Sequence, residues 1–180
     1  MFRGTWKPLA VVGILAALLV PSTGAAAPAR SGGQVVAVAS LESGVLAEMN
    51  SIRRSHGLVP LRLSTPLGAA ARQHSASMAA TGYFSHNSAN GSSFWKRVQS
   101  FYRQGKFGYW SVGENLLWSS PDVDASHALQ MWMNSPPHRE NLLTARWREV
   151  GISAVHVTGA PGTYNGLDVT IVTADFGVRH

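Results

Sequence analysis

The sequence predicts an α+β fold, in which amphipathic helices cover a short antiparallel sheet. Apolar residues recur at helical spacing between positions 41 and 142. Two runs near the C-terminal end, 149–157 and 166–178, are rich in β-branched residues, and a turn-rich segment joins them as in a hairpin. Because the apolar faces of such a sheet need to be covered, the helices are expected to pack against it.

The first 29 residues are predicted to be a secretory signal peptide. Arg3 and Lys7 precede an uncharged apolar run over 9–20, and a stretch of small residues follows it. A helix needs about 20 apolar residues to span a bilayer, so this run is too short for an anchor. We expect cleavage after Ala29, export by the general secretory route to the periplasm, cell envelope or medium, and no integral membrane span in the mature chain.

The composition indicates one exported domain without disulfides. About 150 residues remain after the signal peptide, which is enough for one domain with a hydrophobic core. The chain has no cysteine, so packing alone must stabilise it outside the cytoplasm. Its formal net charge is +6, but the basic residues are scattered. Nucleic acid is therefore a poor partner, and the surface weakly favours anionic lipid or cell-wall polymer.

A domain is expected over 41–178, after a flexible tether. Residues 30–40 are mostly small and include two adjacent glycines, which is typical of a tether. The first helix follows, with apolar residues at helical spacing from Leu41 onward. Ser40 can cap its start, and Gly57 can adopt the left-handed conformation at its end.

The second helix begins at the Ser64-Thr65-Pro66 segment, because proline at the first helical position loses no needed donor, and it runs to Gly82. The elements expected next are a helix over 92–104, a short strand or irregular buried segment over 112–118, a helix opened by 120–122, and a helical turn opened by 135–137.

Three motifs concentrate polar residues near expected element boundaries. They are Ser85-His86-Asn87, then Gly113-Glu114-Asn115-Leu116, and then a segment that runs from Trp132 through Ser135 and His138 to Leu142. In this order the motifs resemble the CAP superfamily of cysteine-rich secretory proteins, antigen 5 and plant pathogenesis-related 1 proteins, and in particular its cysteine-free bacterial SCP-like branch. The resemblance covers roughly 41–178. It implies an α-β-α sandwich of a short antiparallel sheet between helical layers.

The resemblance also implies that His86, Glu114 and His138 converge on one ligand cleft, with Asn115 and Ser135 beside them. Many eukaryotic members carry a second glutamate where this chain has Ser135, so the cluster of two histidines and two glutamates is incomplete. A carboxylate in a cleft needs a protonated histidine, a metal or backbone donors as partners. A helix that begins at Ser135 would keep His138 neutral through its dipole.

Three interpretations of this cluster stay open. It can be a satisfied polar cluster, a reversible site for Zn²⁺ or another divalent cation with His86, Glu114 and His138 as ligands, or a metal-dependent hydrolase that cleaves polypeptide. For the hydrolase, Glu114 and His138 are the catalytic candidates, with Glu114 as ligand or general base. Neither the His-Glu-x-x-His nor the Gly-x-Ser-x-Gly signature is present.

The sequence favours binding over catalysis. We expect an exported binding or interaction module whose ligand is a divalent metal, a lipid, cell-envelope material or a protein. Aromatic residues are dense over 94–110 and alternate with Lys and Arg, which is typical of an apolar groove with a basic rim. Some CAP members bind sterols or fatty acids in such grooves. His74 lies on an apolar helix face and is expected in the core or at the edge of the cleft.

Overall fold

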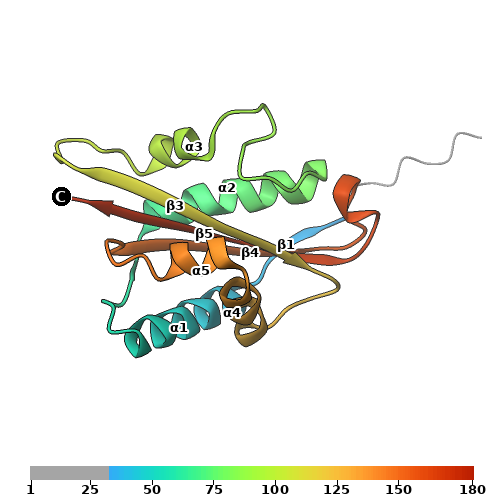
Figure 1. Cartoon of the computed structure of the whole chain (residues 1–180). Helices are drawn as coiled ribbons and strands as arrows, with labels where there is room; N and C mark the ends of the chain where they lie inside the picture. The colour runs from blue at the N-terminus through green and yellow to red at the C-terminus, as the bar shows by residue number, and fades with distance from the viewer. Residues whose placement is uncertain (1–32) are drawn as a thin grey trace, which may run out of the picture.

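A central sheet lies between two helical layers, as the sequence predicts (Figure 1). The structure is a computed structural model that describes residues 33–180. The predicted signal peptide and the first residues of the predicted tether, 30–32, lie outside this range. Helices α1, α4 and α5 cover one face of the sheet, and α2 and α3 cover the other. The α-β-α sandwich is therefore confirmed.

The strand order in the sheet is β1-β4-β5-β3, and β2 pairs with β4 off this path. The predicted hairpin of β4 and β5 is confirmed, and both β1 and β3 also pair antiparallel with their neighbours, whereas β2 is parallel to β4. The strands are β1 (Val35–Ala37), β2 (Arg62–Leu63), β3 (Trp110–Ser119), β4 (Glu149–Val157) and β5 (Val169–Arg179).

Two of the helices begin and end close to their predicted positions. The second has a proline in its first turn and ends at Gly82, which has a φ of 73° in the left-handed region. The first ends just before His56. The helices are α1 (Ala39–Ser55), α2 (Thr65–Thr81), α3 (Phe94–Phe101), α4 (Ala125–Asn134) and α5 (Pro136–Leu142), with a short 3₁₀ turn η1 (Gly162–Tyr164).

Two predicted boundaries are wrong at the N-terminal end of the domain. Residues 35–37, which were expected in a flexible tether, form β1 because they pair with 155–157 of β4. Helix α1 begins at Ala39, and Val38 rather than Ser40 is its N-cap residue, without a side-chain cap. The folded part of the chain therefore begins before position 41.

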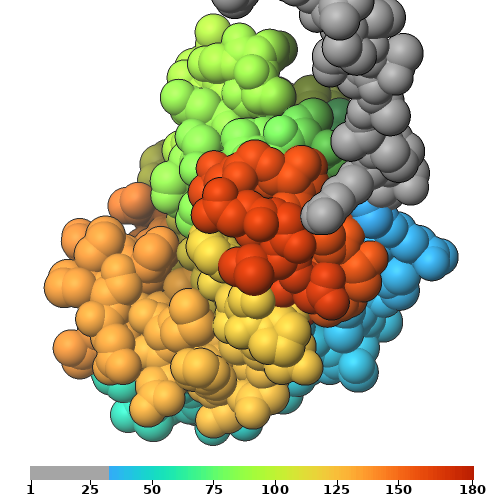
Figure 2. All heavy atoms as spheres, turned by 90° about the vertical axis from the view of Figure 1, so that its right-hand side faces the viewer, coloured from blue at the N-terminus to red at the C-terminus, as the bar shows by residue number. Residues whose placement is uncertain are grey.

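The start of α4 was also predicted too early. Strand β3 continues to Ser119, so residues 120–122 belong to the connection. Helix α4 begins only at Ala125, because the side chain of Asp124 accepts a hydrogen bond from the backbone N–H of His127 at 2.7 Å and caps the helix. This connection lies beside the β4–β5 connection at one end of the sheet (Figure 2).

The two faces of the sheet differ in their apolar clusters and in their buried carboxyl groups, which lie only on the face under α2 and α3 within residues 33–180. The face under α1, α4 and α5 carries one large apolar cluster that includes Trp132, Trp147 and Phe176. The face under α2 and α3 carries two smaller apolar clusters. Buried polar residues also lie on this second face: His74, Ser75, Arg97, Glu114, Thr173 and Asp175.

Candidate functional site

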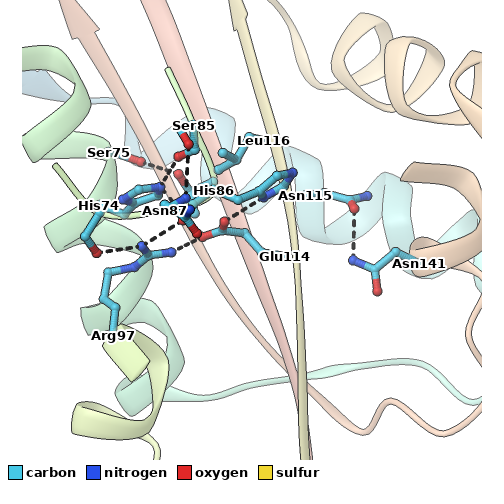
Figure 3. Close-up of polar contacts among 12 residues, drawn as sticks. His74, Ser75, Ser85, His86, Asn87, Arg97, Glu114, Asn115, Leu116 and Asn141 are labelled. Carbon is cyan, nitrogen blue, oxygen red and sulfur yellow. Dashed lines mark hydrogen bonds and ion pairs between the residues drawn. The ribbon is translucent and has the colours of Figure 1, made fainter. Parts of the chain in front are cut away.

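Glu114 lies in the middle of β3 and is the centre of the buried polar residues. Its side chain is 1% exposed and points toward α2 and α3. The next residue, Asn115, points to the other face, because successive side chains of a strand alternate. Glu114 Oε1 lies 2.8 Å from His86 Nδ1, Oε2 accepts a hydrogen bond from Arg97, and His74 Nε2 is 4.0 Å away (Figure 3).

Arg97 of α3 neutralises Glu114 and holds the loop 82–93 in place. Its guanidinium donates to the Glu114 carboxylate from a buried position. It also donates to the backbone carbonyl of His86 and to Ser88 Oγ, both at 3.2 Å. A charged hydrogen bond of this kind is strong in a buried setting. Arg97 therefore connects the sheet to the loop that carries His86.

His74 of α2 is a second contact between the helix and this loop. Its Nε2 donates to the backbone carbonyl of Ser85 at 2.8 Å, so Nδ1 is the unprotonated nitrogen, 3.3 Å from the hydroxyl of Tyr83. Burial, together with the positive charge of Arg97, lowers the pKa of His74 to about 4. The ring is thus neutral near pH 7 and serves to position the loop.

Asp175 of β5 is the cross-strand neighbour of Glu114. It is fully buried, and no hydrogen-bond donor within residues 33–180 contacts either of its carboxyl oxygens. Burial and the nearby carboxylate of Glu114 raise the pKa of Asp175 well above its usual range. Burial also raises the pKa of Glu114 to about 7, against the opposite effect of Arg97. We therefore assign the negative charge of the pair to Glu114 and the proton to Asp175.

The backbone at the start of the loop 82–93 is fixed by the β4–β5 connection. The backbone N–H of Thr163 donates to the carbonyl of Gly82 at 2.7 Å, and the Tyr164 hydroxyl donates to the carbonyl of Tyr83 at 3.0 Å. A Cβ on Gly162 would overlap the carbonyl oxygen of Gly82, so only glycine permits this close approach.

His138 lies in the first turn of α5, away from Glu114. Its Nδ1 is 2.8 Å from Ser135 Oγ, and no hydrogen bond or ion pair within 33–180 joins it to Glu114. Burial and the neighbouring His86 lower the pKa of His138. Asn115 donates to the backbone carbonyl of His138 at 3.0 Å and accepts from Asn141 at 2.9 Å. Asn115 and Ser135 thus position His138 instead of lining the cleft.

His86 and His138 line one cavity, which we call the imidazole hollow. Its volume is about 370 Å³. The side chain of His86 is 52% exposed, whereas Glu114 lies behind it and does not line the hollow. Burial and the positive charge of Arg97 lower the pKa of His86, since Arg97 already neutralises the carboxylate that would otherwise raise it. The lining residues are Phe84, Ser85, His86, Asn87, Leu116 and His138.

The predicted metal ligands do not fit a metal ion in this arrangement. Within residues 33–180, no three His, Cys, Asp or Glu side chains are placed to hold one. Both oxygens of Glu114 are already bonded, to His86 and to Arg97, and the guanidinium would repel a divalent cation at that carboxylate. Of the three predicted ligands, the two imidazoles alone face the same cavity.

Sequence reasoning missed Arg97 and Asp175 as parts of this site. Both left a signal. Arg97 lies on the helix face that also carries Phe94 and Phe101, where a charged side chain is out of place. Asp175 is the one acidic residue within the apolar run of β5, and a buried carboxyl group needs a partner.

The combination of this fold with the Glu114 and histidine motifs agrees with a known family. Residues 46–176 match the family model described as CAP: Cysteine-rich secretory protein family. This chain belongs to the CAP family. Within 33–180, no helix of this CAP domain is both long and apolar enough to serve as a transmembrane segment.

The curated relatives that this CAP domain matches are longer proteins. It is 30% identical over 118 residues to the uncharacterized protein YkwD of Bacillus subtilis. The matched region covers 66% of this chain and 44% of YkwD. It is 32% identical over 111 residues to the uncharacterized membrane protein YlbC of the same organism. Here the matched region covers 62% of this chain and 30% of YlbC. The chain thus spans less than half the length of these relatives.

Solved structures show the same fold. An extracellular protein containing an SCP domain from Bacillus anthracis superposes with a TM-score of 0.59 at 28% identity, over 77% of this chain and 40% of that chain. An outer surface protein from Borrelia burgdorferi superposes with a TM-score of 0.64 at 18% identity, over 82% of this chain and 99% of that chain.

Proposed function

We propose that this CAP domain is a binding module that acts outside the cytoplasm and takes a small amphiphilic ligand in the imidazole hollow. The observation that supports the proposal is that the carboxylate of Glu114 is not accessible to a substrate. Its carboxylate is buried and both oxygens are bonded, to Arg97 and to His86. A general base must reach the proton that it removes, directly or through one water. Glu114 is therefore a structural anion that orients His86.

The chemistry of the imidazole hollow supports an amphiphilic ligand. Its two imidazoles have lowered pKa values, so both rings are neutral near pH 7. The Nδ1 atoms already contact Glu114 and Ser135, so each ring leaves only its Nε2 for a ligand. Phe84 and Leu116 supply apolar surface in the same cavity. A ligand with a polar head between the rings and an apolar part against Phe84 and Leu116 matches this lining. Lipid and cell-envelope fragments both contain such groups.

Two observations support a place outside the cytoplasm. The N-terminal segment has the sequence pattern of a secretory signal peptide. The Bacillus anthracis protein that shares the fold at 28% identity is described as extracellular. A chain without cysteine that is stabilised by one large apolar cluster is suited to this environment, because it needs no disulfide.

The proposal is tested by following the histidine rings by NMR during titration with octanoate, as a lipid probe, or with a soluble peptidoglycan fragment. The resonances of His86 and His138 should shift together, and binding should be lost in His86→Ala and in His138→Ala. His127→Ala is the matched control, because His127 is exposed on α4 and should leave binding unchanged. Shifts confined to other residues would contradict the proposed cavity.

The competing function is a metal-dependent hydrolase, which a second measurement separates from binding. We expect no tight zinc binding by calorimetry, since Glu114 is not available as a ligand. We also expect no chelator-sensitive cleavage of peptides. Cleavage that requires metal and disappears in Glu114→Gln would overturn the binding function.

A further inference from the structure

Basic side chains from four separate segments gather at one end of the sheet, around the C-terminal end of β5. Two hydrogen bonds join these segments: the backbone N–H of Arg62 donates to the Arg148 carbonyl at 3.0 Å, and the Arg179 guanidinium donates to the Arg103 carbonyl at 2.8 Å. The α3–β3 and α5–β4 connections lie beside the C-terminal end (Figure 1). We call this surface the basic end; its cations are Arg62, Arg103, Lys106, Arg146, Arg148 and Arg179.

None of these six cations is paired with a carboxylate of the described residues. The ion pair within residues 33–180 joins Arg97 to Glu114 in the middle of the sheet, and the two contacts of a histidine with a carboxylate also involve Glu114. The carboxylate of Glu149 at the basic end accepts the hydroxyl hydrogen of Tyr102 instead. The six cations outnumber this one carboxylate, and because like charges add their potentials, the basic end carries a positive field.

The opposite end of the sheet has the opposite charge. Exposed aspartates lie in the β3–α4 and β4–β5 connections, which face the viewer in Figure 2. They are Asp122, Asp124 and Asp168. The domain therefore has a positive and a negative end. A negatively charged surface would orient the domain so that the basic end faces that surface.

Apolar side chains are exposed among the cations of the basic end. Leu63 is 66% exposed, Tyr109 is 41% exposed and Phe107 is 37% exposed. The Arg179 guanidinium lies 5.2 Å from the centre of the Phe107 ring. Aromatic rings beside Arg and Lys side chains are typical of surfaces that lie at the interface of a membrane.

The basic end also contains a cavity lined by three arginines, of which Arg148 and Arg179 each use one guanidinium nitrogen for backbone carbonyls. Its volume is about 550 Å³. Guanidinium groups bind phosphate oxygens with two parallel hydrogen bonds, so the cavity suits a phosphate group. The lining residues are Tyr109, Arg146, Arg148, Val178, Arg179 and His180.

We propose that the basic end is a docking surface for a membrane of anionic phospholipid, with a lipid phosphate in the arginine-lined cavity. The exposed apolar residues favour a membrane over a soluble polyanion, because a polyanion in water gives Leu63 and Phe107 nothing apolar to contact. This surface shares no lining residue with the imidazole hollow. Membrane docking and ligand binding can therefore be tested separately.

The test is sedimentation of the mature, exported chain with vesicles of phosphatidylcholine, with and without phosphatidylglycerol. The chain should bind only the anionic vesicles, and added salt should weaken binding. Each basic residue near an anionic surface strengthens binding roughly fivefold. Lys106→Glu and Arg146→Glu should therefore each weaken vesicle binding at least about fivefold.

Arg72→Glu is the matched control, because it makes the same change in charge at an exposed position of α2. It should keep vesicle binding within about twofold of the original chain, because Arg72 is not among the residues that form the basic end or line its cavity. Equal losses in Arg72→Glu and Lys106→Glu would overturn the proposal, as would equal binding to neutral and anionic vesicles. Circular dichroism of each variant checks that it is folded.

Phe107→Ser separates a membrane from a soluble polyanion. It keeps every charge, and it should weaken binding to anionic vesicles several-fold while leaving binding to soluble polyphosphate unchanged. If Phe107→Ser has no effect on vesicle binding and polyphosphate binds as tightly as the vesicles, the basic end attracts polyanions in general, and the membrane proposal is wrong.

Discussion

The face of the sheet covered by α1, α4 and α5 carries one continuous apolar cluster, whereas the face covered by α2 and α3 carries two clusters and a buried polar group. The apolar face gains its stability from area removed from water. On the polar face, Glu114, Asp175 and Arg97 had to leave water, which costs free energy unless their hydrogen bonds replace it. The apolar face is therefore the main source of stability, and the polar face positions the loop 82–93 through Arg97 and His74.

Phe176→Ala should cause the largest loss of stability, because it removes a buried ring from the apolar face. Phe176 is fully buried and stacks on Trp147 with ring centres 6.2 Å apart. Removing a large buried side chain costs about 3–5 kcal/mol. Urea unfolding followed by tryptophan fluorescence measures the loss, with the exposed Phe107→Ala as the control. A loss no larger than that of the control would show that this cluster is not the main source of stability.

Arg97→Met, on the polar face, should lower the free energy of unfolding by somewhat less than Phe176→Ala. It leaves the buried carboxylate of Glu114 without its cation, and breaking a buried ion pair in this way costs about 3 kcal/mol. Lys96→Met is the matched control, because Lys96 is the exposed neighbour in the same helix. Adding Glu114→Gln to Arg97→Met should recover part of the lost stability in urea unfolding. Without such recovery, the contribution of Arg97 does not come from its pairing with Glu114.

Asp175→Asn tests the buried proton through the pH dependence of stability. A carboxyl group whose pKa is raised in the folded state keeps its proton while the unfolded state releases it, so stability falls as pH rises above about 4. Asparagine has no proton to release. The stability of the variant relative to the original chain should therefore increase with pH, by up to about 1.4 kcal/mol per pH unit.

Urea unfolding at about pH 5 and about pH 8 measures this difference. The lowered pKa of His74 changes stability in the opposite direction over the acid range, but it is present in both proteins and cancels in the comparison. The pKa of Glu114, raised to about 7, adds to the fall of stability with rising pH, and because Asp175 helps to set it, the measured difference belongs to the Glu114–Asp175 pair. A constant difference between the two pH values would show that Asp175 is ionised in the folded domain.

His86→Ala should have the smallest effect on stability. Its ring is neutral near pH 7 and half exposed, so water can replace it at Glu114 Oε1, and the loss of one hydrogen bond costs about 1 kcal/mol. We expect this variant to unfold close to the original chain in urea while it loses ligand binding in the imidazole hollow. A loss as large as that of Arg97→Met would place His86 among the residues that stabilise the fold.

Local patterns made most of the fold predictable. The proline and glycine at the two ends of α2 and the β-branched runs of β4 and β5 act through their own backbone preferences, so the sequence is enough to place them. Strands β1 and β3 depend on distant partners instead. Residues 35–37 are extended because they pair with β4, and the glycine and glutamate of β3 belong to a strand because all of β3 pairs with β5.

The candidate site was predictable only in part, for a similar reason. The motifs pointed to His86, Glu114 and His138, but the alternation of β3 directs Glu114 and Asn115 to opposite faces. Glu114 is therefore bonded to His86, and Asn115 to the backbone of His138. The partners that fix the charge of Glu114, Arg97 and Asp175, come from α3 and β5, and only the packing of these elements brings them together.

The close backbone approach of Gly82 and Gly162 means that the loop 82–93 loses its conformational entropy during folding. Hydrogen bonds from Thr163 and Tyr164 fix its start, and Arg97 fixes its middle. A ligand that enters the imidazole hollow then meets a loop that is already ordered, so binding need not supply the free energy of ordering it. The affinity for the proposed ligand would thus be set in part by two glycines that do not line the imidazole hollow.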